Sequence, residues 1–182
     1  MKEAISGAWL FQIVIVMVLL FSGFLAIALN YSKAFQVKNG VVNIIQRQNG
    51  VYGPEISATR PDLNNEGSRR EIQEYLGLVG YRNSGECRRT PTEVEWAGLI
   101  VDGRDGNGRW TTGSGERSNQ RFHLCIYRTV AQRDAIGEGL PDTDLYRVEA
   151  FFRLDLPLIN QLFNLSISGT TTPIFVPGWD IR

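Results

Sequence analysis

The sequence predicts an α+β protein in which a long N-terminal transmembrane helix precedes an antiparallel sheet domain. Three patterns lead to this prediction: a long apolar run near the start, a helical repeat of apolar residues directly behind it, and strand-like segments in the second half of the chain. We therefore expect a short cytoplasmic leader over residues 1–7, a transmembrane helix over 8–30, an amphipathic helix extension over 31–48, and one extracytoplasmic α+β domain over 49–182.

The first element is the apolar run Ala8–Leu29, in which Gln12 and Ser22 are the only polar side chains. A helix of this length spans roughly 33 Å at about 1.5 Å per residue, which matches a hydrocarbon core of about 30 Å. The alternative is a cleaved secretory signal, because residues 26–28 (Ala-Ile-Ala) form a small-x-small site. The apolar run of such a signal is only about 7–15 residues long. We therefore expect a retained single span in contact with membrane lipid.

The charges flanking this run do not decide its orientation, because Lys2 precedes it while Lys33 and Lys38 follow it. Taken alone, they slightly favour a cytoplasmic domain. Two cysteines and a polar, glycine-rich stretch in the remaining chain favour an exported domain instead. We expect a single-pass protein of the cell membrane, with a cytoplasmic N-terminus and an extracytoplasmic C-terminal domain.

The charge balance of the chain speaks against nucleic-acid binding. Its 19 basic residues are matched by 19 acidic ones, whereas binding to phosphate backbones needs a net basic face. The pairs Arg69-Arg70 and Arg88-Arg89 are therefore predicted to form ion pairs at the surface rather than a phosphate site.

Apolar residues continue at three- and four-residue spacing behind the span, which predicts that the helix extends to about Gln48. Gly40 lowers the helix propensity of this segment, by roughly 1 kcal/mol relative to alanine. Asn49-Gly50 then provides a stop, with Gly50 as the left-handed cap. The apolar face consists of Ala34, Val37, Val41, Ile44 and Ile45.

A second, short helix is predicted after an irregular connection over residues 51–67. Ser68 and Glu71 match a capping box at its start, and Gly77 lies where a C-terminal cap is expected. Its apolar face consists of Ile72, Tyr75 and Leu76.

The remaining chain has the patterns of strands. A continuous apolar run predicts a central strand over residues 94–101, and a similar run predicts a second strand over 122–130. Strict alternation predicts a third strand over 146–156, ended by Pro157. The last part is expected to form a helical turn over 158–163, a strand over 164–168, and a continuation over 170–175 after Gly169.

Cys87 and Cys125 are the only cysteines, and in an exported domain they are predicted to form a disulfide. The chain-entropy model gives about 4 kcal/mol for a loop of about 39 residues. Two reduced core thiols are the main alternative. A reactive or metal-binding Cys–His pair with His123 is disfavoured, because there is no C-x-x-C spacing and no identifiable orienting acid.

The segment Gly103–Gln120 is predicted to be a polar loop around a hairpin tip, with Trp110 as a possible partner contact. Asp102, Asp105 and Asn107 would offer oxygen ligands to calcium, but they lack the spacing of an EF-hand. A solvated hairpin tip is therefore preferred over a metal site.

Catalytic motifs are absent from the sequence. It contains no recognisable Ser-His-Asp set, no phosphate-binding glycine loop and only one histidine. We therefore expect a protein that is not an enzyme, with no cofactor, metal or small-molecule substrate.

The two ends of the chain resemble those of TadE-like proteins, a family of pilin-like, single-span membrane proteins. Gly7 followed by an apolar run resembles a type IV prepilin processing site, where a peptidase cuts after the glycine and thus before Ala8. Gln12 stands at the position where type IV prepilins have a glutamate, which helps to pair one subunit with the next in the membrane. At the other end, residues 152–160 and 165–171 resemble the family's last strands and proline turn. The resemblance covers about the first 48 and the last 40 residues.

This resemblance implies a pilin-like or pseudopilin fold whose helix packs with other pilin-like subunits or assembly proteins. Polar and small residues promote helix association in membranes, which makes Gln12, Ser22 and Gly23 candidate packing residues. We expect a noncatalytic structural or assembly component of a pilus or secretion apparatus. The alternative is a membrane-tethered extracellular binding module that uses residues 103–120.

Overall fold

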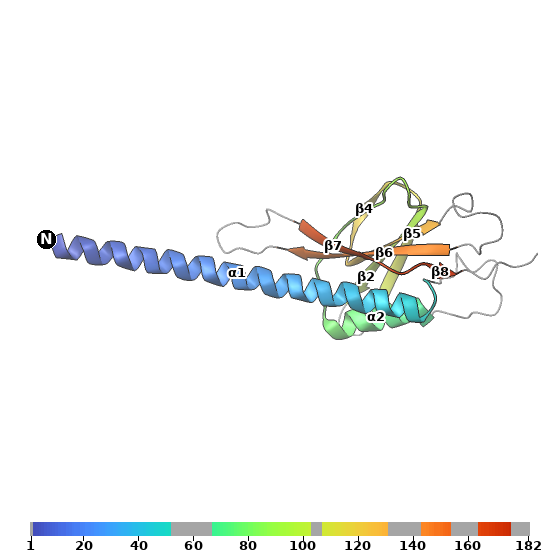
Figure 1. Ribbon diagram of the computed structural model, residues 1–182, viewed down its shortest axis with the longest axis horizontal. Coiled ribbons are helices and arrows are strands. Elements are labelled where there is room, and N and C mark those ends of the chain that lie inside the picture. Colours follow the sequence, from blue (N-terminus) through green and yellow to red (C-terminus); the bar gives the residue numbers. More distant parts are fainter. Residues whose placement is uncertain (1, 52–66, 103–106, 131–142, 154–163, 176–182) are drawn as a thin grey trace, which may run out of the picture.

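The computed structural model describes residues 2–51, 67–102, 107–130, 143–153 and 164–175. It confirms the α+β class, with one long apolar helix followed by an antiparallel sheet domain (Figure 1). Helix α1 (Lys2–Arg47) has 46 residues. Its first half extends beyond the domain, and its second half lies along the domain (Figure 1).

Helix α1 ends close to the predicted position, but the left-handed residue is Asn49 rather than Gly50. The φ angle of Asn49 is 55°, close to that of a left-handed helix, and that of Gly50 is also positive at 129°. The Gly50 N–H donates to the Ile45 carbonyl at 2.9 Å, and the Asn49 N–H donates to the Gln46 carbonyl at 3.3 Å. These are the two hydrogen bonds of a Schellman motif, which satisfy the last carbonyls of the helix.

Helix α2 (Gly67–Val79) lies antiparallel to the second half of α1. The predicted cap at Gly77 is wrong, because the helix continues to Val79 and Gly80 adopts a φ of 62°. Gly80 and the residue after it complete a second Schellman motif, with N–H donors to the carbonyls of Gly77 and Leu76. The helix begins at Gly67, one residue before the Ser68 predicted to cap it.

The strands form one six-stranded and one two-stranded sheet, both antiparallel. The large sheet has the order β3-β2-β5-β6-β7, and β8 also pairs with β6. The strands are β1 (Gly85–Arg88), β2 (Glu95–Asp102), β3 (Asn107–Gly113), β4 (Arg117–Phe122), β5 (Leu124–Val130), β6 (Thr143–Arg153), β7 (Asn164–Thr170) and β8 (Ile174–Phe175).

Both helices pack on one face of the large sheet, where they enclose the main core. All five predicted apolar residues of the α1 extension are buried there. Each full burial of a Val or Ile side chain contributes about 1.5–3 kcal/mol. The sheet contributes alternate residues of its central strands: Leu99, Val101, Leu124, Ile126, Tyr146, Val148, Ala150 and Phe152.

The opposite face of the large sheet is covered by the two-stranded ribbon β1–β4. A second core lies between them and includes the disulfide between Cys87 of β1 and Cys125 of β5, whose Cα atoms are 5.6 Å apart. The domain thus has three layers: helices, sheet and ribbon. The second core consists of Cys87, Trp96, Phe122, Cys125, Tyr127 and Phe151.

Several predicted strand boundaries needed correction. Phe122 ends β4 instead of opening β5, and β7 passes through Gly169 without the predicted break. Most of the predicted loop 103–120 forms strands, since β3 pairs with β2 along its whole length and β4 pairs with β1. The predicted irregular connection (apart from Val51 and Gly67), the end of the third strand with Pro157, and the helical turn 158–163 lie outside the described residues.

Candidate functional surface

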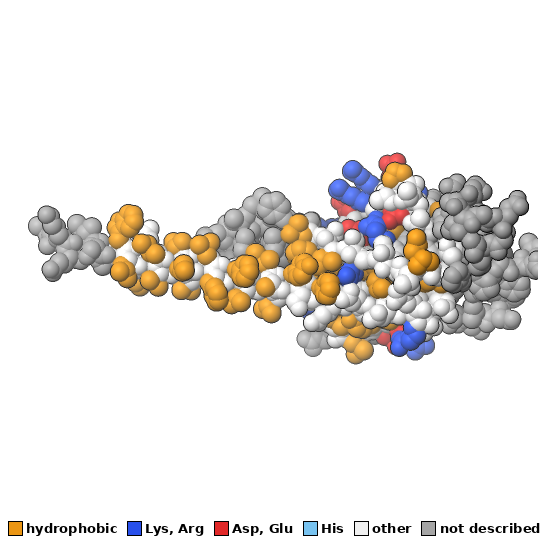
Figure 2. All heavy atoms as spheres, in the orientation of Figure 1, with side chains coloured by type: hydrophobic (Ala, Val, Ile, Leu, Met, Phe, Trp, Pro, Cys, Tyr) orange, Lys and Arg blue, Asp and Glu red, His pale blue; other side chains and the backbone are white. Residues whose placement is uncertain are grey.

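Most of the large apolar side chains that the described residues expose lie on the first half of α1 (Figure 2). Most of its large apolar side chains are exposed, from 42% at Leu19 to 71% at Leu29. The segment Trp9–Arg47 contains a window long and apolar enough to cross a membrane, and only 6% of that window is buried. A soluble protein seldom exposes an apolar area of this size, so this surface is suited to a partner or to lipid.

We call the stretch 9–29 of α1, whose large apolar side chains are mostly exposed, its bare half. The candidate packing residues lie within it. Gln12 is exposed on it, whereas the hydroxyl of Ser22 donates to the carbonyl of Leu19 at 3.0 Å within the helix. Gln12 and Gly23 are separated by about three helical turns, which places them within about 20° of each other around the axis. Gln12 and Gly23 therefore share one face, and the Ser22 hydroxyl is already hydrogen-bonded. Gly7 and Ala8 lie in α1, and the processing site there remains a prediction.

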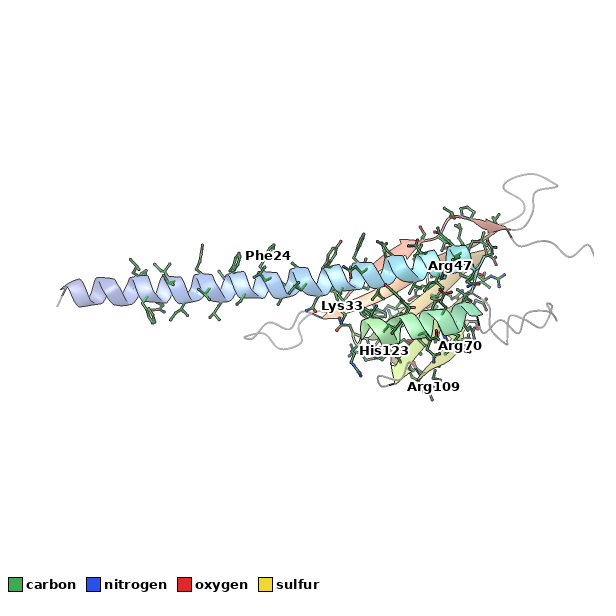
Figure 3. All side chains as sticks on the ribbon, turned by 90° about the horizontal axis from the view of Figure 1, so that it is seen from below. Phe24, Lys33, Arg47, Arg70, Arg109 and His123 are labelled. Carbon is green, nitrogen blue, oxygen red and sulfur yellow. A yellow bond between two sulfur atoms is a disulfide. The ribbon has the colours of Figure 1, made fainter. Side chains whose placement is uncertain are left out.

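Aromatic and basic side chains mark the junction between the bare and the packed halves of α1. Tyr31 makes an edge contact with Phe152 of β6 at 5.9 Å and stacks with Phe35 at 6.3 Å. The Lys38 ammonium lies 4.3 Å from the centre of the Phe35 ring. The Lys33 ammonium donates to the Gly80 carbonyl at 3.2 Å, and Figure 3 shows Lys33 at this end of α2. The junction is therefore a belt of amphipathic side chains.

Beyond the junction, α1 and α2 approach each other closely. A Cβ at Gly40 would lie 2.4 Å from the Tyr75 ring, so glycine is what allows this crossing. The Tyr75 hydroxyl donates to the Gln36 carbonyl at 3.2 Å. Farther along, Arg47 donates to Glu71, which thus links the two helices. Gly40 therefore lowers the helix propensity of α1 but makes room for the Tyr75 ring of α2.

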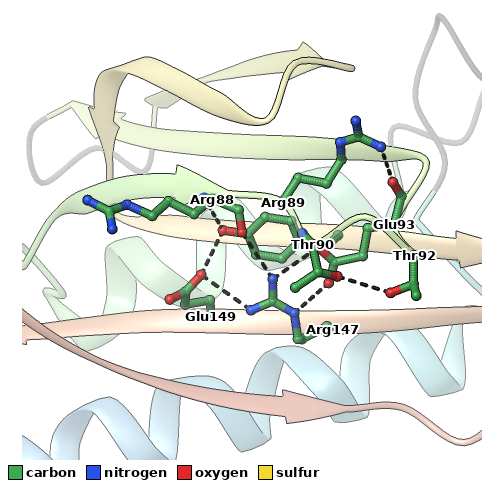
Figure 4. Close-up of polar contacts among 8 residues, drawn as sticks. Arg88, Arg89, Thr90, Thr92, Glu93, Arg147 and Glu149 are labelled. Atoms are coloured by element: carbon green, nitrogen blue, oxygen red, sulfur yellow. Dashed lines mark hydrogen bonds and ion pairs between the residues drawn. The ribbon is translucent and has the colours of Figure 1, made fainter.

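A network of charged side chains lies on the ribbon side of the sheet (Figure 4). The Arg147 guanidinium donates to the buried Glu93 carboxylate at 2.5 and 3.1 Å and lies 3.9 Å from the centre of the Tyr127 ring. The Tyr127 hydroxyl donates to Glu149 at 2.6 Å and accepts from the Arg88 N–H at 2.8 Å. The single guanidinium of Arg147 thus pairs with the carboxylates of both Glu93 and Glu149, which offsets part of the cost of burying these charges.

Burial is the largest single influence on the pKa of both Tyr127 and Arg147, but it decides the direction of the shift only for Tyr127. It raises the pKa of the Tyr127 hydroxyl, and the neighbouring Glu149 raises it further. Burial lowers the pKa of Arg147, but pairing with Glu93 outweighs this and the net shift is upward. The alternation of β6 placed Arg147 and Glu149 on a polar face in the sequence. Their pairing with Glu93 required the tertiary structure, because that residue is 54 positions away from Arg147.

The predicted pairing of the two cysteines is confirmed at disulfide distance, which leaves Cys125 with no free thiol. His123 lies between β4 and β5 rather than on the predicted strand. Its backbone N–H donates to the Leu99 carbonyl at 2.8 Å, and its Nδ1 accepts the Val101 N–H at 3.1 Å. His123 thus makes two hydrogen bonds with the backbone of β2 at the point where the pairing of β2 with β5 ends.

Trp110 does not lie at an exposed loop tip. It belongs to β3, is half-buried, and packs against the main core with its ring 5.5 Å from the Arg69 guanidinium. Among the described residues, no group of three or more His, Cys, Asp or Glu side chains could hold a metal ion. Asp105 of the disfavoured calcium set lies outside the described residues, and nothing is described for the side chains of Asp102 and Asn107.

The four predicted surface arginines have different environments. Arg70 pairs with Glu74 at 2.9 Å, and Arg88 lies 3.7 Å from Glu86, as expected of exposed ion pairs. Arg89 instead donates to the backbone carbonyls of Glu93 and Val94. Arg69 is only 8% exposed, because it is buried over Trp110, so the surface prediction is wrong for this residue.

Comparison with protein-family models, curated proteins and solved structures finds no match to this chain.

Proposed function

We propose that the protein is a noncatalytic, membrane-anchored subunit of a pilin-like assembly, in which α1 crosses the bilayer and packs against helices of other subunits. The observation that supports this most directly is the contrast along α1, whose second half is packed into its own domain while the first half is bare. A bare apolar helix needs lipid or other helices around it.

The polar residue within this helix supports assembly rather than simple anchoring. A glutamine amide in hydrocarbon is stabilised by hydrogen bonds to another helix, and a glycine on the same face allows close approach. Gln12 and Gly23 provide this combination, and the same face continues into Ala34 and Val41 of the packed half. A partner helix bound to this face of the bare half lies on the side of α1 that faces the domain, next to the end of the domain. A minor pseudopilin of the TadE-like kind is the class that fits these features and the resemblance of the chain ends.

An extracytoplasmic domain with a cytoplasmic N-terminus belongs to the same proposal. The buried disulfide between β1 and β5 supports it, because such bonds persist in oxidising compartments. The alternative function, a tethered binding module that uses residues 103–120, has less support, because Trp110 packs against the core.

The test is self-association of the full chain in vesicles, measured by energy transfer between labelled copies, for the wild type and Gln12→Leu. We expect Gln12→Leu to weaken association about 3- to 10-fold, which corresponds to an interhelical hydrogen bond of about 0.6–1.5 kcal/mol. Val14→Ala is the matched control, because Val14 is also exposed but lies about 200° around the helix from Gln12, so its loss leaves association through the Gln12 face unchanged. Equal association of all three proteins would contradict subunit packing through Gln12.

A further inference from the structure

The exposed apolar side chains of the folded part gather at one end of the domain. Beyond residue 29, the described chain exposes five large apolar side chains: Tyr31, Phe35, Leu78, Val94 and Leu165. Leu78 of α2 is the most exposed of them at 87%. Four of the five lie at the end where α1 leaves the domain, and only Val94 lies at the opposite end, beside the start of β2.

Contacts between the elements place these four residues at one height along α1. The hydrogen bond from Lys33 to the Gly80 carbonyl brings the end of α2, and with it Leu78, to the level of Lys33. Leu165 pairs with Phe152 in the sheet, and Phe152 contacts Tyr31. Helix α2 and strand β7 thus both present an exposed leucine at the level of residues 31–33, and they flank α1 through Tyr75 and Gly169 respectively.

This height coincides with the expected surface of a bilayer. The apolar run ends at Leu29, and Lys33 lies only about 6 Å farther along the helix at about 1.5 Å per residue. The headgroup region on each side of a bilayer is about 5–8 Å thick. Trp9 and Tyr31, separated by about 33 Å along the helix, would occupy the two interfaces in which such aromatic residues are favoured.

We propose that the domain is seated on the membrane surface, with Leu78 and Leu165 inserted into the lipid headgroup layer on both sides of α1. This inference depends on the proposed transmembrane position of α1. The occupant of this surface is lipid because the patch is continuous with the bare helix. The adjacent ammonium groups of Lys33 and Lys38 are also suited to phosphate headgroups. Such seating fixes the tilt of the domain relative to the bilayer before any subunit is bound.

The test uses single cysteines introduced into the full chain with its disulfide intact and labelled with an environment-sensitive dye. Leu78→Cys and Leu165→Cys report on the patch, Val94→Cys is the matched exposed control, and Phe24→Cys reports on the span. The proteins are placed in vesicles of phosphatidylcholine and phosphatidylglycerol that contain lipids spin-labelled either near the headgroup or deep in the acyl chain.

We expect the dyes at positions 78 and 165 to shift to shorter wavelength and to be quenched more by the shallow than by the deep label. The dye at position 94 should remain unquenched. Quenching at position 24 by the deep label, with positions 78 and 165 behaving like 94, would overturn the seating and leave the span intact. Absence of quenching at position 24 would overturn the transmembrane proposal itself. A blue shift at 78 and 165 without lipid quenching, reversed by dilution in lipid, would identify a second copy as the occupant and overturn the lipid assignment.

Discussion

The two halves of α1 have similar compositions but opposite surroundings, because the first half is exposed and the second is packed into the domain. Both are rich in aliphatic residues, yet Ile15 in the first half is 43% exposed whereas Ile45 in the second is fully buried. The difference arises from patterning, because the first half is apolar around its whole circumference and the second is apolar on one face. One continuous helix therefore combines a half that is packed into a protein core with a half that is suited to lipid or to other helices.

The largest expected effect compares matched substitutions in the two halves. Ile45→Ala should lower the free energy of unfolding of the domain by about 2–5 kcal/mol, because it leaves a cavity in the main core. Ile15→Ala should leave it unchanged, because this side chain belongs to neither core of the described residues. Chemical denaturation in detergent micelles, followed by tryptophan fluorescence, measures both. Equal destabilisation by the two variants would contradict the division of α1.

The second-largest effect is expected at alkaline pH, which should destabilise the domain but leave the first half of α1 helical. Burial raises the pKa of Tyr81 and of Tyr127, so both hydroxyls bind their protons more tightly in the folded than in the unfolded state. Stability is therefore constant with respect to these groups below about pH 10 and falls above it, by up to about 1.4 kcal/mol per pH unit for each tyrosine. The span Ala8–Leu29 has no ionisable side chain and should stay helical.

Circular dichroism checks this prediction, with near-ultraviolet signals for the domain and far-ultraviolet signals for the helix. Tyr127→Phe should make the decline above pH 10 shallower. A decline of the same steepness in this variant would assign the alkaline transition to other groups.

A smaller effect is expected at the end of the packed half of α1, where the chain leaves the helix through the left-handed residue Asn49. Asn49→Ala should cost about 1–2 kcal/mol, since alanine tolerates the left-handed conformation poorly. Asn49→Gly should be neutral or slightly stabilising in the same denaturation experiment. A neutral alanine variant would show that the chain can leave the helix without this turn.

The smallest effect is expected at the exposed surface of the domain. Arg70→Ala removes an ion pair with Glu74 on α2 whose partners are both exposed. Such a pair contributes about 0.3–0.5 kcal/mol, which added salt screens. Thermal unfolding at low and high ionic strength should show a difference only at low ionic strength. A loss that persists in high salt would mean that the Arg70 side chain also packs.

Local signals predicted the parts of the fold that depend on neighbours in sequence. The spacing of Ala34, Val37 and Val41 predicted which face of α1 is buried, and the alternation around Val148 predicted strand β6. Strands β1, β3 and β4 were missed, because they contain few apolar residues and show no sustained alternation of apolar and polar side chains. Their strand conformation comes from backbone pairing with β2 and with each other.

The candidate functional residues also fall into two groups, those that the sequence could predict and those that it could not. Gln12, Gly23 and the apolar run around them are visible in the sequence, since a helix that is apolar on all sides is typical of a membrane span or of the core of a large protein. Burial of Arg69 over Trp110 had no local signal, because the two residues are brought together by α2 lying over β3. The same holds for Leu78, whose exposure at the level of Lys33 depends on how α2 returns along α1.

The sequence by itself determined the long helix, its change from uniformly apolar to one-sided, and the single pair of cysteines. These features depend on periodicity and composition, which act over a few residues. Only the tertiary structure decided that Gly80 rather than Gly77 caps α2, that Glu93 pairs with Arg147, and that two exposed leucines lie at the level of residues 31–33 of α1. Those outcomes depend on contacts between distant segments, whose energies are set by packing and have no counterpart in local sequence.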